Sequence, residues 1–336
     1  MATDVNTDKP TITDIAREAG VSTATVSRVI NRQGTVKQAS IDAVLDAIQR
    51  LGYSKRESKR PQGNGGPLIA VVLPDIINPF YSRIIDGVSS ACRGHNYRFV
   101  LSLASEEEAN QKRFLDEIRD MAPRGILLLT PITDVGVLQQ LEKTAPVVQC
   151  AEFSEQASLP YVSIDDFAAS RSLVEYMLSK GYRKIAIING PREFKYSRKR
   201  LEGYKSALKN AGISVNRNYI YHVSNIHFET ALPIISQLLS SATRPDALLC
   251  VSDVFAAAAV RAANLQGLSI PKDIAIAGID DTYLAAMCTP TITCVRQPQY
   301  SLGVTACELL LERISNPYAP FRHILLPTEL VVRESL

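Results

Sequence analysis

The stretch T-I-T-D-I-A-R-E-A-G-V-S-T-A-T-V-S-R-V-I-N, residues 11–31, decides the fold of the first part of the chain. Thr11 is a good N-cap, and Asp14 stands at the third helical position, where a carboxylate meets free backbone N–H groups. The four residues A-G-V-S then separate this helix from a second one, which Ser22 or Thr23 caps. Such spacing is typical of a helix-turn-helix.

A third helix is predicted from about Gln38 to Arg50, because its apolar residues recur at the spacing of one buried helical face. The second helix shows small hydroxyl residues on its outer side, which allow a helix to lie deep in the major groove of DNA. Arg28 on the same side can bind a guanine with two hydrogen bonds. The alternative is an ordinary three-helix unit with a hydroxyl-rich surface.

The charge of the chain is concentrated near its N-terminus. The 336 residues contain 37 Lys plus Arg and 34 Asp plus Glu, a net charge of +3. Residues 1–66 hold 10 of the basic and 7 of the acidic residues, whereas the remaining 270 residues hold 27 of each. A locally basic piece joined to a neutral body favours a nucleic-acid module, and a solvated tail is the alternative.

Composition and motifs exclude several classes of protein. With 46% hydrophobic and 21% charged residues, the chain has globular proportions. We find no signal peptide at the start and no apolar run long enough to span a membrane, so we expect a cytoplasmic protein without a membrane partner. The cysteines are scattered, which predicts buried reduced thiols instead of disulfides or a zinc site. They are Cys92, Cys150, Cys250, Cys288, Cys294 and Cys307.

From residue 68 onward, apolar runs alternate with amphipathic stretches, which predicts parallel sheets covered by helices on both faces. About ten such units are too many for one compact sheet, so we expect two doubly wound lobes. Strands are predicted at 68–73, 98–103, 125–130, 146–150, 161–165, 184–189, 247–252, 273–278 and 291–295. Helices are predicted at 79–94, 106–121, 167–181, 197–211, 227–241, 253–267 and 299–314.

Ligands of such folds bind beyond the carboxyl ends of the strands and, between two lobes, in the cleft. Polar and aromatic residues that follow the strands suit a small polyhydroxy or heterocyclic ligand. Each has a structural alternative: Asp253 as a helix cap, Phe80 as part of a turn, Arg200 in a surface ion pair. The candidates are Asn78, Phe80, Tyr81, Phe194, Tyr196, Arg200, Asp253, Asp280 and Gln297.

Residues 11–31 closely resemble the N-terminal signature of the LacI/GalR family of bacterial repressors, and the resemblance extends over nearly the whole chain. It implies an all-α helix-turn-helix headpiece followed by a two-lobed α/β core like the periplasmic binding proteins, with doubly wound parallel sheets. By this resemblance, base-reading positions are Thr23, Ala24 and Arg28. Phosphate-holding positions are Thr11, Thr25, Ser27, Asn31 and Lys37.

The core resembles the branch of that family that responds to cytidine, in the stretches V-V-L-P-D-I-I-N-P-F-Y-S-R-I-I-D-G and V-R-Q-P-Q-Y-S-L-G. The resemblance therefore implies a nucleoside effector, held by the candidates above together with Ser252, where the family commonly has Asn or Asp. The rings would stack on the base, and Arg200 and Asp280 would hold ribose hydroxyls. A pentose or a purine remains an alternative.

The linker, S-K-R-E-S-K-R-P-Q-G-N-G-G-P, cannot fold alone, because it is rich in glycine, proline and charge. In the family this segment often becomes a helix that inserts a leucine into the minor groove. Here Gln62 replaces that leucine and Pro61 would disturb a helix. We therefore expect a flexible basic strap whose Lys55, Arg56 and Arg60 contact phosphates.

The sequence thus predicts three parts: a helix-turn-helix domain (1–53), a basic linker (54–67) and an effector-binding and dimerisation domain (68–336). In the last, one lobe comprises 68–166 and 297–323, and the other comprises 167–296 and 324–336. We expect a repressor that binds a near-palindromic operator as a homodimer and needs no cofactor or metal. A second DNA-bound regulator is left open.

Two other classes are disfavoured. An enzyme is not expected, because the four histidines show no metal spacing and no hydrolase, P-loop or dinucleotide-binding motif occurs. A sugar-binding receptor of a transporter is disfavoured by the basic headpiece and by the missing signal peptide.

Overall fold

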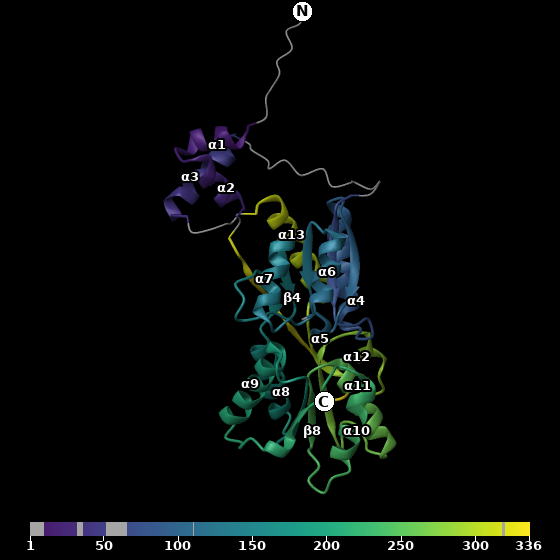
Figure 1. Cartoon of the computed structure of the whole chain (residues 1–336). Helices are drawn as coiled ribbons and strands as arrows, with labels where there is room; N and C mark the ends of the chain where they lie inside the picture. The colour runs from purple at the N-terminus through teal and green to yellow at the C-terminus, as the bar shows by residue number, and fades with distance from the viewer. Residues whose placement is uncertain (1–9, 32–35, 52–65, 110, 318–319) are drawn as a thin grey trace, which may run out of the picture. The chain divides into compact units, whose positions relative to one another are not determined.

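The chain divides into two compact units, and their boundary falls inside the predicted linker (Figure 1). None of the helices in the described part is long and apolar enough to cross a membrane. The units are Met1–Asn64 and Gly65–Leu336. The computed structural model describes residues 10–31, 36–51, 66–109, 111–317 and 320–336.

The first unit consists of three helices, α1 (Ile12–Ala19), α2 (Thr23–Asn31) and α3 (Gln38–Leu51). Thr11 and Asp14 form the predicted capping box, because the Asp14 carboxylate accepts the Thr11 backbone N–H at 2.8 Å. The reciprocal bond runs from the Asp14 backbone N–H to the Thr11 hydroxyl. The helix-turn-helix prediction is therefore confirmed.

A small apolar core holds these three helices together. Ile15 of α1, Val26 of α2 and Val44 of α3 are fully buried, at the positions that the helical periodicity predicts. An ion pair of 3.5 Å between Arg50 and Glu18 joins α3 to α1 at the surface. Because the core uses only the inner faces, the outer face of α2 stays exposed.

The second unit contains two six-stranded sheets, so the prediction of two doubly wound lobes is confirmed. All strand pairs are parallel except β10 with β12. The first sheet has the order β11 (His323–Leu326), β5 (Tyr161–Ile164), β4 (Val147–Cys150), β3 (Gly125–Leu128), β1 (Leu68–Leu73), β2 (Arg98–Leu103). The second has the order β12 (Glu329–Val331), β10 (Thr293–Arg296), β9 (Ala275–Asp280), β8 (Ala247–Cys250), β6 (Ile185–Asn189), β7 (Ile220–His222).

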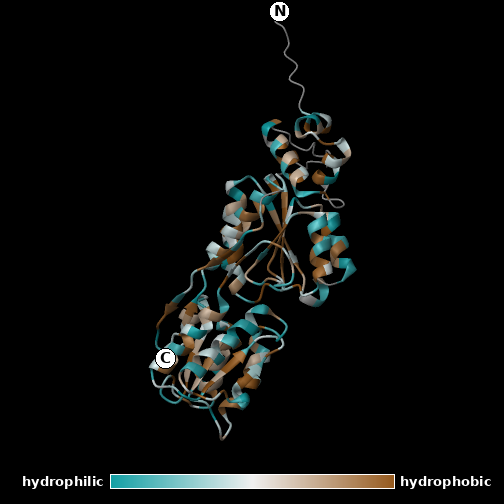
Figure 2. Ribbon diagram, turned by 90° about the vertical axis from the view of Figure 1, so that its left-hand side faces the viewer, coloured by the Kyte–Doolittle hydropathy of each residue, from teal (hydrophilic) through white to brown (hydrophobic). Residues whose placement is uncertain are grey.

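Helices cover both faces of each sheet, and their polar sides face outward while the strands are mainly apolar (Figure 2). In the first lobe these are α4 (Phe80–Gly94), α5 (Glu106–Ala109), α6 (Lys112–Met121), α7 (Val135–Thr144) and α13 (Gln299–Ser315). In the second they are α8 (Asp166–Ser179), α9 (Lys195–Asn210), α10 (Phe228–Leu239), α11 (Asp253–Leu265), α12 (Tyr283–Met287) and the 3₁₀ turn η1 (Arg217–Tyr219).

The structure differs from the sequence prediction in its elements and in the lobe boundaries. The helix predicted at 106–121 is two helices, α5 and α6, and the elements α7, α12, β7, β11 and β12 were not predicted. The predicted lobe boundary at 323/324 is wrong, because β11 pairs with β5 through Leu326. The first crossover lies at Asp165, the N-cap of α8, so Asp166 belongs to the second lobe.

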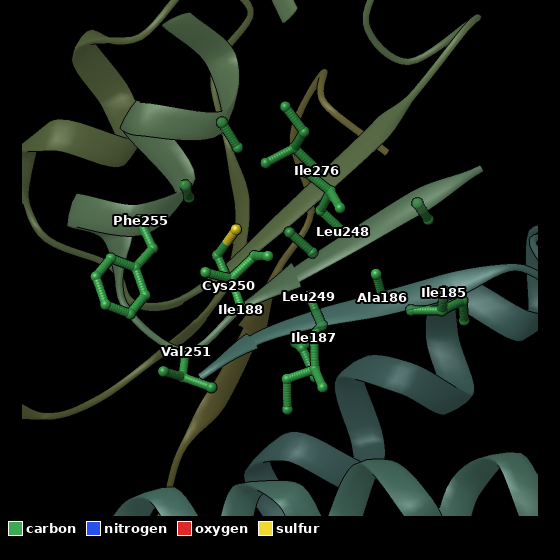
Figure 3. Packing of buried hydrophobic residues seen from close by; sticks show 14 of the residues in the cluster. Ile185, Ala186, Ile187, Ile188, Leu248, Leu249, Cys250, Val251, Phe255 and Ile276 are labelled. Atoms are coloured by element: carbon green, nitrogen blue, oxygen red, sulfur yellow. The ribbon is translucent and has the colours of Figure 1, made fainter. Parts of the chain in front are cut away.

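The core of the second lobe is built from the continuous apolar runs of its central strands. Figure 3 shows Ile187 of β6, Leu249 of β8 and Phe255 of α11 within this cluster. All six cysteines are free thiols, as the sequence predicts, and five of them are buried. The strands therefore form a rigid frame, and their carboxyl ends carry the polar residues described next.

Candidate functional site

The outer face of α2 presents the residues that the sequence assigned to base reading. Thr23, Ala24 and Arg28 are all exposed. Thr25 is half-buried. Its backbone N–H donates to the Ser22 hydroxyl at 3.1 Å, so Ser22 caps the helix. The side chains on this face are small, apart from the long cationic side chain of Arg28. Such a surface fits the major groove.

The structure describes some of the remaining residues that were predicted to contact DNA, and others lie outside the described residues. Thr11 is exposed at the start of α1, and Lys37 is exposed just before α3. Ser27 is half-buried on α2. The side chain of Asn31 and the linker residues Lys55, Arg56 and Arg60 lie outside the described residues.

A cleft that is open to solvent, with about 550 Å³ of empty space, lies between the two sheets of the second unit. Both lobes contribute lining residues to the cleft, and these residues lie beyond the carboxyl ends of the strands, as the fold class predicts. The lining residues are Asn78, Phe80, Tyr81, Leu129, Pro131, Ala151, Glu152, Asp166, Tyr196, Arg200, Ile226, Val251, Ser252, Asp280 and Gln297. The cleft thus brings together eight of the ten predicted effector residues.

Arg200 forms the cationic centre of this cleft and is not a surface residue, since it is only 5% exposed. Its Nε donates to Asp166 Oδ1 at 2.8 Å, and one terminal nitrogen donates to the carbonyl of Val251. The guanidinium also lies 5.2 Å from the centre of the Tyr196 ring. Burial acts to lower the pKa of Arg200, but the charges of Asp166 and Asp280 outweigh it and raise that pKa.

Asp280 provides an acceptor facing the cleft at the end of β9. Its two carboxylate oxygens accept hydrogen bonds from the Ser252 hydroxyl (3.1 Å) and the Gln297 amide (2.7 Å). The backbone of Asp280 has a φ of 137°, a conformation that L-residues rarely adopt. Burial raises the pKa of Asp280 to about 6, although Arg200 opposes this shift.

Two carboxylates of the cleft were not predicted from the sequence. Asp166 binds both cations of the region, Arg200 and Lys195, whose Nζ lies 2.6 Å from Asp166 Oδ2. Glu152 accepts the backbone N–H groups of Lys195 (2.5 Å) and Tyr196 (3.1 Å) at the start of α9. Each acid follows a predicted strand by one or two residues, so the strand-end criterion would have found both.

The pKa values of these two acids move in opposite directions. Burial acts to raise the pKa of Asp166, but the charges of Lys195 and Arg200 outweigh it and hold that pKa below its ordinary value. Burial raises the pKa of Glu152 to about 7, although Lys195 opposes the shift. Lys195 and Arg200 therefore favour the charged form of Asp166, whereas the raised pKa of Glu152 favours its neutral form up to about pH 7.

Aromatic rings form the apolar side of the cleft. The rings of Phe80 and Tyr81 pack edge to face, with 5.5 Å between their centroids. The guanidinium of Arg200 lies over the ring of Tyr196. Asn78 anchors the start of α4, since its side-chain oxygen accepts the Phe80 backbone N–H at 3.1 Å. The cleft therefore combines π-faces with a charged and hydroxyl-rich side.

Two predicted effector residues do not line the cleft. Asp253 points away from it, and its carboxylate accepts the backbone N–H and the hydroxyl of Thr282. Burial, together with the charge of Asp280, raises the pKa of Asp253 well above its ordinary value. Phe194 lines an adjoining hollow of about 620 Å³ that shares Pro131 and Glu152 with the cleft.

The described residues contain no cluster of His, Cys, Asp or Glu that could hold a metal ion.

Comparison with known proteins identifies relatives of both units. Residues 11–55 match the family model of the bacterial regulatory proteins of the lacI family, and residues 174–336 match the periplasmic binding protein-like domain. The HTH-type transcriptional repressor CytR of Escherichia coli K12 is 34% identical over 97% of this chain and 96% of its own length.

Two further relatives agree with this. The ribose operon repressor of Escherichia coli K12 is 33% identical, over 91% of this chain and 94% of its own. A solved structure of the transcriptional regulator CelR in complex with cellobiose is 30% identical, with a TM-score of 0.74 over 97% of this chain and 100% of that one. Sequence and structure thus match regulators along the full length.

Proposed function

Because the chain belongs to the LacI/GalR family of bacterial transcriptional regulators, we propose that it represses transcription from a near-palindromic operator as a homodimer. A small molecule bound in the cleft controls this activity. One helix reads one half-site, and two-fold symmetry supplies the second reading helix.

The exposed face of α2 supports the DNA-binding part of the proposal. Thr23 and Ala24 are small enough to let the helix approach base edges, and Arg28 extends beyond them. Thr11 and Lys37 are exposed and are proposed to bind phosphates, which would fix the register of the helix on the duplex. Lys55, Arg56 and Arg60 are proposed to add phosphate contacts from the linker.

The presence of both Arg200 and Asp280 in the lining of the cleft carries the effector part. The guanidinium has five N–H donors, and those not bonded to Asp166 or Val251 can donate to a ligand hydroxyl. The Asp280 carboxylate retains lone pairs that can accept from a neighbouring hydroxyl. A donor and an acceptor in the lining of one cleft suit the hydroxyls of a sugar.

Phe80, Tyr81 and Tyr196 favour a nucleoside such as cytidine over a free pentose, because a base supplies the π-face that these rings would stack on. Ser252, Gln297 and Asn78 add hydrogen-bonding groups. A pentose is the second candidate, since Arg200 and Asp280 bind sugar hydroxyls equally well and one relative is named for a ribose operon. A purine is a further alternative for the same rings.

The test is retardation of DNA selected from a random pool by the purified chain. We expect a near-palindromic consensus and release of the DNA by cytidine, with ribose, adenosine and hypoxanthine as competitors in parallel. Absence of a sequence-specific shift at low salt would contradict the DNA-binding proposal, since low salt strengthens phosphate contacts. The relatives are regulators, so an enzyme or transport receptor is not proposed.

A further inference from the structure

We propose that the cleft selects an uncharged effector and excludes its phosphorylated form, with Glu152 as the specificity-determining residue. This inference rests on the proposed function, because it concerns the charge of the same effector. Three observations carry it: the balance of charge, the occupation of helix N-termini, and the position of Glu152 between the two hollows.

The charge around the two hollows is negative. Their described lining contains the bases Lys195, Arg198 and Arg200, and more acids than bases. Each base already contacts a carboxylate: Lys195 and Arg200 contact Asp166, and Arg198 contacts Glu155 at 3.0 Å. No surplus cation is therefore available for a phosphate. The acids are Glu152, Glu155, Asp166, Glu193 and Asp280.

Helix N-termini are the usual alternative site for a phosphate, but those of α8, α9 and α11 are bonded by side chains of the protein itself. Asp165 caps α8 by accepting the Ala168 backbone N–H. Ser252 caps α11 by accepting the Val254 backbone N–H at 3.3 Å. At α9, the N-cap residue makes no side-chain cap bond, and Glu152 from the other lobe takes two of its free N–H groups.

Glu152 lies at the junction of the two hollows, against the N-terminus of α9. It is only 9% exposed and borders both the cleft and the adjoining hollow. A phosphate that extended from a sugar in the cleft toward that hollow would meet this carboxylate, while the α9 N-terminus behind it is already satisfied. Like charges brought together without solvent cost several kcal/mol, enough to separate a nucleoside from its monophosphate.

This selectivity places the effector in a reaction sequence by class. The regulator would respond to a molecule that a phosphatase or nucleotidase produces and a kinase consumes. Phosphorylation of the effector would then end the signal without any change in the protein.

The test is calorimetry on the full chain at pH 8 with two probe pairs, cytidine with cytidine 5′-monophosphate and ribose with ribose 5-phosphate. In a pair whose neutral member binds, we expect the phosphorylated member to bind about 100-fold more weakly. In Glu152→Gln this ratio should shrink to about tenfold or less, because the amide keeps an acceptor and removes the charge. Glu175→Gln is the control, since Glu175 is an exposed acid on α8 paired with Arg171.

A phosphorylated probe that binds the wild type as tightly as its neutral partner, at a site abolished by Arg200→Ala, overturns the exclusion. If no neutral probe binds, the effector proposed above is wrong. Thermal unfolding with inorganic phosphate at matched ionic strength then tests separately whether the cleft excludes phosphate. Stabilisation by phosphate that Arg200→Ala removes contradicts the exclusion, and no such stabilisation supports it. Failure of the exclusion and failure of the proposed function are thereby distinguished.

Discussion

The reading face of α2 and the cleft of the second unit place their functional side chains in opposite environments. On α2, Thr23, Ala24 and Arg28 belong to one short helix and are exposed. In the cleft, Arg200 and Asp280 belong to different elements and are buried. An exposed contact can be removed without unfolding the helix that carries it, whereas a buried charge cannot lose its partner cheaply. The two regions should therefore respond very differently to substitution.

The largest effect is expected from Arg200→Ala. It removes one of the two cations that neutralise the buried Asp166 carboxylate and should cost about 3–5 kcal/mol of unfolding free energy, together with the response to the effector. Urea unfolding and calorimetry measure the two losses. Arg171→Ala is the control, because Arg171 forms an exposed pair with Glu175 and should change stability by less than about 0.5 kcal/mol. Equal losses of unfolding free energy in Arg200→Ala and Arg171→Ala would contradict the expectation that the buried ion pair costs more to break than the exposed one.

The next effect is the pH dependence that Glu152 confers. Its pKa is about 7 in the folded chain against 4.5 ordinarily, so protonation favours the folded state, and this stability is lost as pH rises through 7. Between pH 5 and pH 8, Glu152→Gln should gain up to roughly 3 kcal/mol relative to wild type. Thermal unfolding of both proteins across this range measures the difference, and a gap independent of pH would refute it.

Arg28→Ala should act on DNA alone. Loss of a two-bond contact to guanine is expected to weaken operator binding by about 1–3 kcal/mol and to relax the preference for one base pair. Because Arg28 is exposed, the urea midpoint and the affinity for the effector should not change. Retardation on operators with that base pair replaced measures the preference, and an equal loss on every sequence would identify a phosphate contact instead.

The smallest effect is expected at the start of α1. Thr11→Ala removes the cap that bonds the Asp14 backbone N–H and should destabilise the first unit by about 1 kcal/mol. Thr11→Ser keeps the hydroxyl and serves as the control. Circular dichroism of the thermal transition distinguishes them, and identical curves for the two variants would assign Thr11 no capping role.

Local patterns explain which features could be predicted from the sequence. The capping box of Thr11 and Asp14 depends on residues three apart, and the apolar strands depend on continuous runs, so both were predicted correctly. The strand-end criterion placed Arg200 and Asp280 in the cleft. The linker residues and their contacts lie outside the described residues and stay predictions.

What could not be predicted depends on partners far away in the chain. Asp253 follows its strand just as Asp280 does, but its carboxylate turns toward Thr282, a residue 29 positions later. The bond from Glu152 to α9 joins residues 43 and 44 positions apart. The sequence indicates neither the direction of these side chains nor their partners. Packing within the second lobe joins Asp253 to Thr282, and packing of the two lobes joins Glu152 to α9.

Retardation of a selected operator by wild type, Arg28→Ala and Arg200→Ala, each with and without cytidine, tests the central claim most directly. We expect wild type to retard the DNA and to release it with cytidine. Arg200→Ala should retard the DNA but fail to release it, and Arg28→Ala should bind cytidine by calorimetry but fail to retard the DNA. Release of the DNA from Arg200→Ala by cytidine, or unchanged retardation by Arg28→Ala, would contradict the division of roles between the two units.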